Sequence, residues 1–168
     1  MFHNIQEIHE DYLRSIIFGF QDALVSTTGV IVGVAAGTSD KPLVILAGVV
    51  TIAVEALSMG VGQYMSEKSV HQMDTTGKHT DNLYVGGGLM FASYFLGGLV
   101  PLAPIIFLQL PFSSTVSIGF SLVGLFILGY MKAKWVKVNP WHSAFEMLLL
   151  GGATTTIGLL VGKFFQVM

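Results

Sequence analysis

Two acidic residues and one methionine stand out in this chain of 168 residues because each lies within a long apolar stretch. Asp22 lies in the first stretch and Glu55 in the second, and Met59 follows Glu55 by four residues. A carboxylate in a bilayer helix costs about 2.5–3.5 kcal/mol on insertion scales, so it persists where it has a partner or reaches water. Carboxylate and thioether ligands together suit a transition metal better than Mg²⁺ or Ca²⁺. The three residues predict a metal site within a membrane.

The composition supports a membrane location and excludes several functions. Hydrophobic residues make up 52% of the chain and charged residues 11%, whereas about a quarter of the residues in a soluble domain are charged. The net charge of −2 and the lack of a basic stripe argue against nucleic-acid binding. The absence of cysteine excludes disulfides and thiolate ligands. No nucleophile–base pair, nucleotide loop or redox motif indicates an enzyme.

Five stretches are long enough to cross a bilayer, which takes about 20 mostly apolar residues. We therefore expect an all-α integral membrane protein with a five-helix transmembrane domain over 15–168. The first 14 residues are acidic, unlike a secretory signal, and their apolar residues recur at helical spacing, which predicts an interfacial helix. Residues 66–84 form the one long polar connection. The predicted spans are 15–37, 43–65, 85–108, 112–131 and 143–165.

The basic residues predict an orientation, because they are enriched in cytosolic connections. With the N-terminus in the cytosol, six of the eight basic residues are cytosolic, and only Lys41 and Lys163 lie on the far side. We therefore expect a cytosolic N-terminus, a cytosolic 66–84 loop and a C-terminus on the far side. The predicted cytosolic residues are Arg14, Lys68, Lys78, Lys132, Lys134 and Lys137.

Helix geometry predicts that the three residues share one layer of the membrane. Asp22 lies about 10 Å from the cytosolic end of its helix, Met59 about 9 Å and Glu55 about 15 Å, at 1.5 Å per residue. Glu55 and Met59 are four apart and share a helix face. Asp22 lies on a stripe of small and polar residues that permits close helix approach, with helix packing as the simpler reading of its glycines. This stripe contains Gly19, Ser26, Gly29, Gly33 and Gly37.

Other polar or sulfur-containing residues are weaker candidates for the same path. Methionine in an apolar helix usually fills the core, and an acid in the first turn of a helix, such as Glu146, complements the helix dipole. A polar residue in a solvated connection, such as Glu67, needs no ligand to explain it. The weaker metal candidates are Ser26, Ser58, Gln63, Met65, Glu67 and Glu146.

Several motifs resemble those of the vacuolar iron transporter family. These are GFQDALVS at 19–26, EALSMGVGQYMS at 55–66, GGLVPLAP at 97–104 and the glycines of the last span. Together they extend over all five spans in order. Gln63 stands where many members carry glutamate, and the 66–84 loop is too short for the glutamate-rich metal-binding domain of the best-known members. The chain is therefore similar to a shorter, transmembrane-only branch.

The resemblance implies a homodimer that exports Fe²⁺, in some members Mn²⁺, from the cytosol in exchange for protons. It assigns ion or proton binding to Asp22 and metal contact to Met59, with Glu55 lining the same path. The partners are then the metal, protons and the bilayer, without a permanently bound cofactor. The membrane would be the plasma membrane in a prokaryote and a vacuolar or other internal membrane in a eukaryote. Two alternatives remain: a gated metal channel, and a non-transporting scaffold or metal sensor whose acids lock the dimer.

Overall fold

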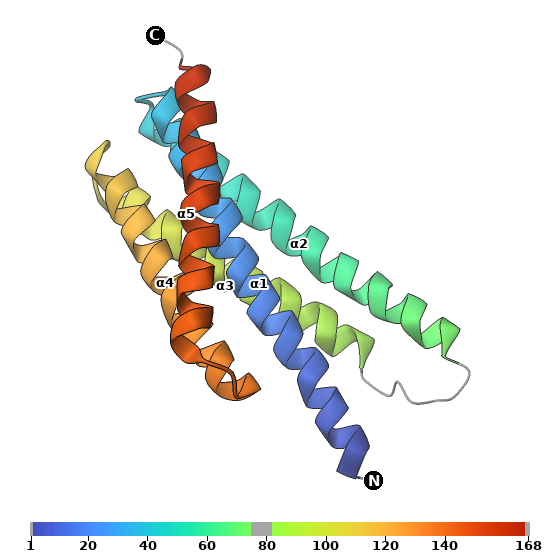
Figure 1. The fold of residues 1–168 in the computed structure, drawn as a ribbon. Coiled ribbons are helices and arrows are strands. Elements are labelled where there is room, and N and C mark those ends of the chain that lie inside the picture. The colour runs from blue at the N-terminus through green and yellow to red at the C-terminus, as the bar shows by residue number, and fades with distance from the viewer. Residues whose placement is uncertain (1, 75–81, 167–168) are drawn as a thin grey trace.

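The computed structural model describes residues 2–74 and 82–166, which form a bundle of five long helices (Figure 1). Each helix has a segment long and apolar enough to cross a membrane, and the described residues contain no strand. This confirms the predicted all-α, multi-pass membrane architecture. The helices are α1 (Phe2–Gly37), α2 (Lys41–Met73), α3 (Leu83–Phe107), α4 (Phe112–Val136) and α5 (Pro140–Phe164).

Successive helices run in alternating directions, so the two ends of the bundle have different compositions (Figure 1). The N-terminus lies at one end, which we call the Arg14 end, and the C-terminus lies at the other, which we call the Asp40 end. Among the described basic residues, only Lys41 and Lys163 belong to the Asp40 end. The structure therefore gathers the basic residues as expected, while their cytosolic location stays a prediction.

Short polar segments end the helices for local chemical reasons. Asn82 precedes α3, and its side-chain oxygen accepts hydrogen bonds from the backbone N–H groups of Tyr84 and Val85 at 3.0 and 3.4 Å. Asn139 caps α5 in the same way. Such capping satisfies N–H groups that lack a partner in the first turn of a helix. Pro42 and Pro140 stand in the first turns of α2 and α5, where proline needs no N–H partner.

α1 and α2 extend furthest beyond the spans that the sequence analysis predicted. α1 runs unbroken from Phe2, so no boundary separates a 1–14 interfacial helix from the first span. α2 continues to Met73, so residues 66–73 of the expected 66–84 loop are helical, whereas 75–81 lie outside the described residues. Hydropathy marks the apolar part of a helix, but a helix ends only where a breaker or cap stops it. No glycine or proline occurs between Gly62 and Met73.

α3 is the most buried span, and it packs against α1, α2 and α4. Within the described ranges, α2 contacts only α1 and α3, so one side of α2 faces outward. An apolar cluster joins α1, α2 and α3 toward the Asp40 end. Its buried members are Ile31, Val44, Ile52, Leu102 and Ile105.

α1 and α5 approach backbone to backbone. A Cβ atom on Gly158 would overlap the carbonyl oxygen of Gly29, and one on Gly162 would overlap that of Gly33. Glycines at such spacing let membrane helices pack closely. Gly19 instead packs against Ser93 of α3, so the small-residue stripe of α1 contacts two different neighbours.

Candidate metal site

Four candidate residues form one line along α2. Glu55, Met59, Gln63 and Glu67 are spaced by four residues, so each lies beside the next on the helix surface, and the line turns by about 120° around α2 between Glu55 and Glu67. Their burial increases along this line: Glu55 is exposed, Met59 and Gln63 are half-buried, and Glu67 is buried. The line therefore connects the middle of the bundle with the Arg14 end.

Asp22 of α1 lies opposite the Glu55 end of this line. Asp22 is half-buried, and its carboxylate lies close enough to that of Glu55 for the two charges to repel each other. The structure thus brings together the two intramembrane acids that the sequence placed at similar depths. Two carboxylates in a medium of low dielectric attract a cation strongly, because each would otherwise be desolvated without a counter-charge.

A buried tyrosine of α3 completes this layer. The hydroxyl of Tyr94 lies 2.6 Å from the hydroxyl of Ser26, and the Ser26 hydroxyl lies 2.7 Å from the backbone carbonyl oxygen of Asp22. If Ser26 donates its single proton to that carbonyl, Tyr94 must donate to Ser26. Asp22 and Glu55 both act electrostatically on the Tyr94 hydroxyl. Tyr94 thus links α3 to the helix turn that carries Asp22.

Sequence reasoning overlooked Tyr94, although a signal was present. Tyr94 lies in an otherwise apolar stretch of α3, and a phenol buried there needs a hydrogen-bond partner. Hydropathy alone counts such a tyrosine as part of the span. Which helix supplies its partner depends on lateral packing, which one sequence does not specify.

Met59 lies beside the same layer. Its side chain packs against a buried cluster formed by Ala23, Ala56 and Tyr94. Ala23 follows Asp22 in the chain, and Ala56 follows Glu55. The thioether therefore lies among the immediate neighbours of both acids, and the set offers carboxylate, hydroxyl and thioether groups.

The remaining candidates lie elsewhere. Ser58 is exposed on α2 and flanks Glu55 at a spacing of three residues, whereas Met65 is exposed away from Glu55 and Met59. Glu146 is exposed on α5, which makes no contact with α2 in the described part of the chain. Gln63 and Glu67 lie together near Arg14. The described residues contain no group of three or more acidic, histidine or cysteine side chains placed to hold a metal, so one copy contributes two carboxylates to the Asp22 layer.

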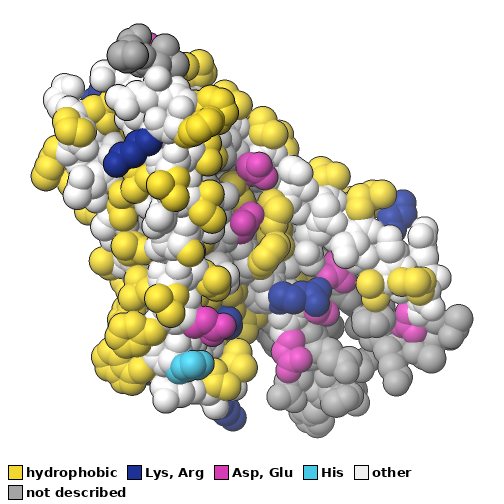
Figure 2. All heavy atoms as spheres, turned by 45° about the horizontal axis from the view of Figure 1, so that its top comes forward, with side chains coloured by type: hydrophobic (Ala, Val, Ile, Leu, Met, Phe, Trp, Pro, Cys, Tyr) yellow, Lys and Arg dark blue, Asp and Glu magenta, His cyan; other side chains and the backbone are white. Residues whose placement is uncertain are grey.

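The surface around this layer combines charge with apolar area. Figure 2 shows acidic side chains within a face of mixed hydrophobic and uncharged surface, and further acidic and basic side chains toward one end. A largely apolar groove of about 740 Å³ runs between α1 and α5, from Val25 and Ser26 toward Gly162 and Phe165. Ser26 therefore belongs both to the layer of Asp22 and to this groove, which continues toward the Asp40 end.

Comparison with protein families gives a match over nearly the whole chain. The model of the VIT family matches residues 13–83 and 71–163. These two segments include Asp22, Glu55, Met59 and Tyr94, and parts of all five helices.

Curated relatives are distant but matched over most of their lengths. Vacuolar iron transporter 1 of Oryza sativa subsp. japonica is 22% identical over 217 aligned positions, which include 93% of this chain and 86% of that protein. The vacuolar iron transporter of Toxoplasma gondii is 24% identical, and the alignment includes 94% of this chain and 76% of that protein. Vacuolar iron transporter homolog 2 of Arabidopsis thaliana is 25% identical, and the alignment includes 88% of this chain and 85% of that protein.

The lengths of these alignments distinguish two kinds of relative. Those with the Oryza and Toxoplasma proteins extend over 217 and 228 positions, so both proteins contain residues without a counterpart in this chain. The alignment with the Arabidopsis homolog extends over 167 positions. The two segments of the family match overlap at residues 71–83, from the end of α2 to the start of α3. This is the division expected for a short, transmembrane-only member.

Proposed function

Since the chain belongs to the VIT family, we propose that it transports Fe²⁺ across a membrane and that Asp22, Glu55 and Met59 bind the ion in transit. The arrangement that supports this proposal is Asp22 of α1 opposite Glu55 of α2, with Met59 packed against Ala23, Ala56 and Tyr94. Mn²⁺, which carries the same charge and accepts similar ligands, is a second substrate.

The transport is an exchange for protons. The positive-inside rule favours a cytosolic Arg14 end, so metal enters there and leaves toward the Asp40 end. Protons arriving from the far side compete with the metal for Asp22 and Glu55, and protonation of the carboxylates releases the ion. The groove between α1 and α5 begins at Ser26 and extends toward the Asp40 end, which is the side on which the ion would leave.

The transporting unit is a parallel homodimer. Glu55 is exposed in the single chain, on a side of α2 that also exposes Ser58, Gly62 and Ser66. A carboxylate facing lipid costs about 2.5–3.5 kcal/mol, whereas a second copy covering this side shields it. A two-fold axis also brings two copies of the Asp22–Glu55 pair to one path. The dimer would thereby place four carboxylates along one path.

Fe²⁺ uptake into proteoliposomes with an imposed pH gradient tests the proposal. Asp22→Asn and Glu55→Gln should each lower the initial rate about tenfold or more, since a contact with a charged group contributes about 1.5–3 kcal/mol. Met59→Leu should mainly raise KM, because it keeps the volume and removes the sulfur. Asp40→Asn and Met131→Leu are matched controls, as both residues lie outside the candidate layer.

The same assay separates the alternatives. A pH-sensitive dye inside the vesicles should show protons leaving the vesicles as metal enters them. Flux that persists without a gradient and moves no protons would indicate a channel. A scaffold or sensor predicts that Asp22→Asn with Glu55→Gln weakens the dimer, measured by light scattering, while vesicles of the parent protein take up no metal. Full uptake by either single variant would contradict the proposed site.

A further inference from the structure

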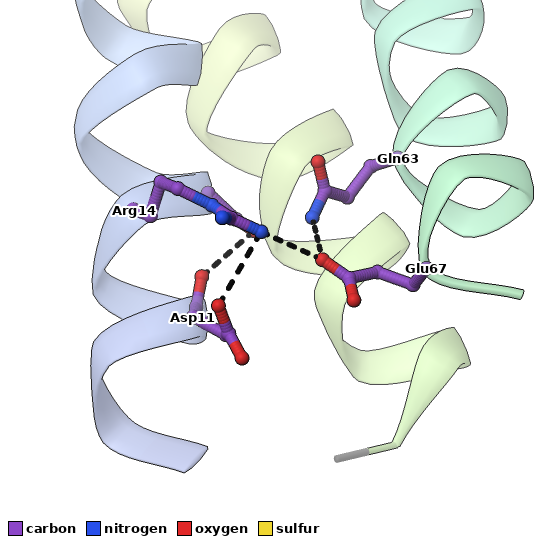
Figure 3. A network of polar contacts seen from close by, with 5 residues as sticks. Asp11, Arg14, Gln63 and Glu67 are labelled. Carbon is purple, nitrogen blue, oxygen red and sulfur yellow. Dashed lines mark hydrogen bonds and ion pairs between the residues drawn. The ribbon is translucent and has the colours of Figure 1, made fainter. Parts of the chain in front are cut away.

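An ion pair joins α1 and α2 at the Arg14 end. The Arg14 Nη2 atom lies 2.8 Å from Glu67 Oε1, and the Gln63 amide donates to the same oxygen at 2.8 Å. Arg14 also lies 3.3 Å from Asp11 Oδ1, one turn earlier on α1. Figure 3 shows Arg14 and Glu67 reaching toward each other from their two helices. This network is a tie between α1 and α2 outside the candidate metal layer.

The tie lies on the same two helices as the metal layer, nearer the Arg14 end. Glu67 ends the line that begins at Glu55, about 18 Å away along α2, and Arg14 precedes Asp22 by about 12 Å along α1, at 1.5 Å per residue. A cation that approaches Asp22 between α1 and α2 from the Arg14 end must therefore pass Arg14 and Glu67.

The two partners differ in exposure, which decides how the tie can open. The Glu67 side chain is 8% exposed and that of Arg14 is 64% exposed. A buried carboxylate needs a counter-charge, whereas an exposed guanidinium can exchange its partner for water. Glu67 therefore favours a cation beside it, and Arg14 can swing into solvent when a competing cation binds there.

Resting on the transport function proposed above, we propose that the Arg14–Glu67 pair is an electrostatic gate at the metal entrance. With the pair formed, α1 and α2 are held together over the path. A divalent cation that binds Glu67 displaces the Arg14 guanidinium, and the helices can then separate toward Asp22. Arg14 is a positioning residue in this scheme, and Glu67 is the first contact of the incoming ion.

Thiol labelling tests the gate without measuring transport, since the chain contains no cysteine. Ala56 is wholly buried beside Ala23 and Tyr94, so a cysteine there reports separation of α1 from α2. In lipid nanodiscs, an Ala56→Cys protein should react slowly with a bulky maleimide. Adding Arg14→Gln should raise the rate about tenfold, as expected when a charge-assisted hydrogen bond is lost. Arg14→Lys, which keeps the charge, should stay slow.

Three further variants separate a gate from a general loss of packing. Lys132→Gln removes a cation at the same end of the bundle, on α4, and should leave labelling slow. The exchange of Arg14→Glu with Glu67→Arg restores an ion pair and should restore slow labelling. A double variant that labels as fast as Arg14→Gln would overturn the gate, as would an Arg14→Gln protein that labels as slowly as the parent. Size-exclusion profiles establish that each variant is folded.

Adding Fe²⁺ under anaerobic conditions tests the opening step. Fe²⁺ should raise the labelling rate of the Ala56→Cys parent several-fold, and it should have no effect with Glu67→Gln, whose labelling should already be fast. If Fe²⁺ does not change the labelling rate of the Ala56→Cys parent, opening by the cation is overturned. In the uptake assay, Glu67→Gln should raise KM more than it lowers kcat, because the residue acts at entrance rather than at the metal layer.

The two proposals fail separately. If Asp22→Asn abolishes uptake while labelling does not depend on Arg14, transport stands and the gate is wrong. If labelling depends on Arg14 and Fe²⁺ but no variant or parent moves metal, the gated cation entrance stands and transport is wrong.

Discussion

The two ends of the contact between α1 and α2 are closed in different ways. At the Asp40 end, Ile31, Val44 and Ile52 pack together in a cluster with residues of α3. At the Arg14 end, Arg14 and Glu67 form an ion pair. Apolar packing responds to shape and volume, whereas an ion pair responds to competing ions. Competing cations can therefore loosen the contact at the Arg14 end, whereas the Asp40 end responds to changes in side-chain volume.

A second contact strengthens this asymmetry. The half of α1 nearest the Asp40 end also touches α5 through Gly29 and Gly33, backbone against backbone. Such a contact leaves no side chain that could rearrange. α1 thus has a close backbone contact with α5 along its Asp40 half, whereas an ion pair joins its Arg14 half to α2.

The largest expected effect comes from disrupting the contact of α1 with α5. Gly162→Ala places a methyl group against the Gly33 carbonyl oxygen, so the helices must move apart. We expect the free energy of unfolding to fall by about 3 kcal/mol, which is the upper end of the usual cost of overpacking. Titration with a denaturing detergent measures it. Gly152→Ala is the matched control, because a Cβ there meets nothing within 4 Å; equal losses would contradict the close approach.

Truncation in the apolar cluster should have the next largest effect. Ile31→Ala leaves a cavity among α1, α2 and α3, and we expect it to lower the free energy of unfolding by about 2 kcal/mol. Labelling of Ala56→Cys should remain sensitive to Arg14, since the ion pair is untouched. Ile127→Ala, at a position 52% exposed on α4, provides the comparison. A loss no larger than that of Ile127→Ala would mean that the cluster does not hold the Asp40 end.

Removing the Tyr94 hydroxyl tests the middle of the contact. Tyr94→Phe breaks the hydrogen bond to Ser26, and we expect a loss of about 1 kcal/mol. Fe²⁺ uptake should also slow, because the turn that carries Asp22 is less firmly positioned. Tyr84→Phe, at an exposed tyrosine on the same helix, should change neither quantity. Unaltered Fe²⁺ uptake by the Tyr94→Phe protein would show that the Tyr94 hydroxyl does not contribute to the site.

The smallest effect is expected at Asp11. Its contact with Arg14 is long, at 3.3 Å, and Arg14 is largely exposed; exposed ion pairs contribute about 0.2–1 kcal/mol. Asp11→Asn should therefore change the labelling rate by less than about twofold. A rate as high as that of Arg14→Gln would show that Asp11, rather than Glu67, holds the guanidinium in place.

The sequence predicted the five helices well because each contains an apolar stretch of bilayer length. It also placed Asp22 and Glu55 at similar depths, and the structure brings the two charges within reach of each other. The metal-binding role of both residues stays a prediction.

Other features could not be predicted because they depend on lateral packing. Hydropathy placed Glu67 in a loop, where a solvated acid needs no explanation, and only the continuation of α2 to Met73 places it beside Arg14. The glycines of α1 form a single stripe in the sequence, yet Gly19 packs on α3, and Gly29 and Gly33 on α5. Periodicity defines a face of a helix, but it does not identify which helix covers that face.

Because α2 continues unbroken beyond Met65, its length sets the direction in which any segment joined to its end points. Each residue added to or removed from an α-helix turns the following segment by about 100° and moves it by about 1.5 Å. A domain grafted after Met73 would thus point toward α1 with one linker length and away from it with the next. Engineers who transplant a metal-capturing module onto this chain should therefore vary the linker one residue at a time, and should expect delivery to the entrance to recur with the period of the helix.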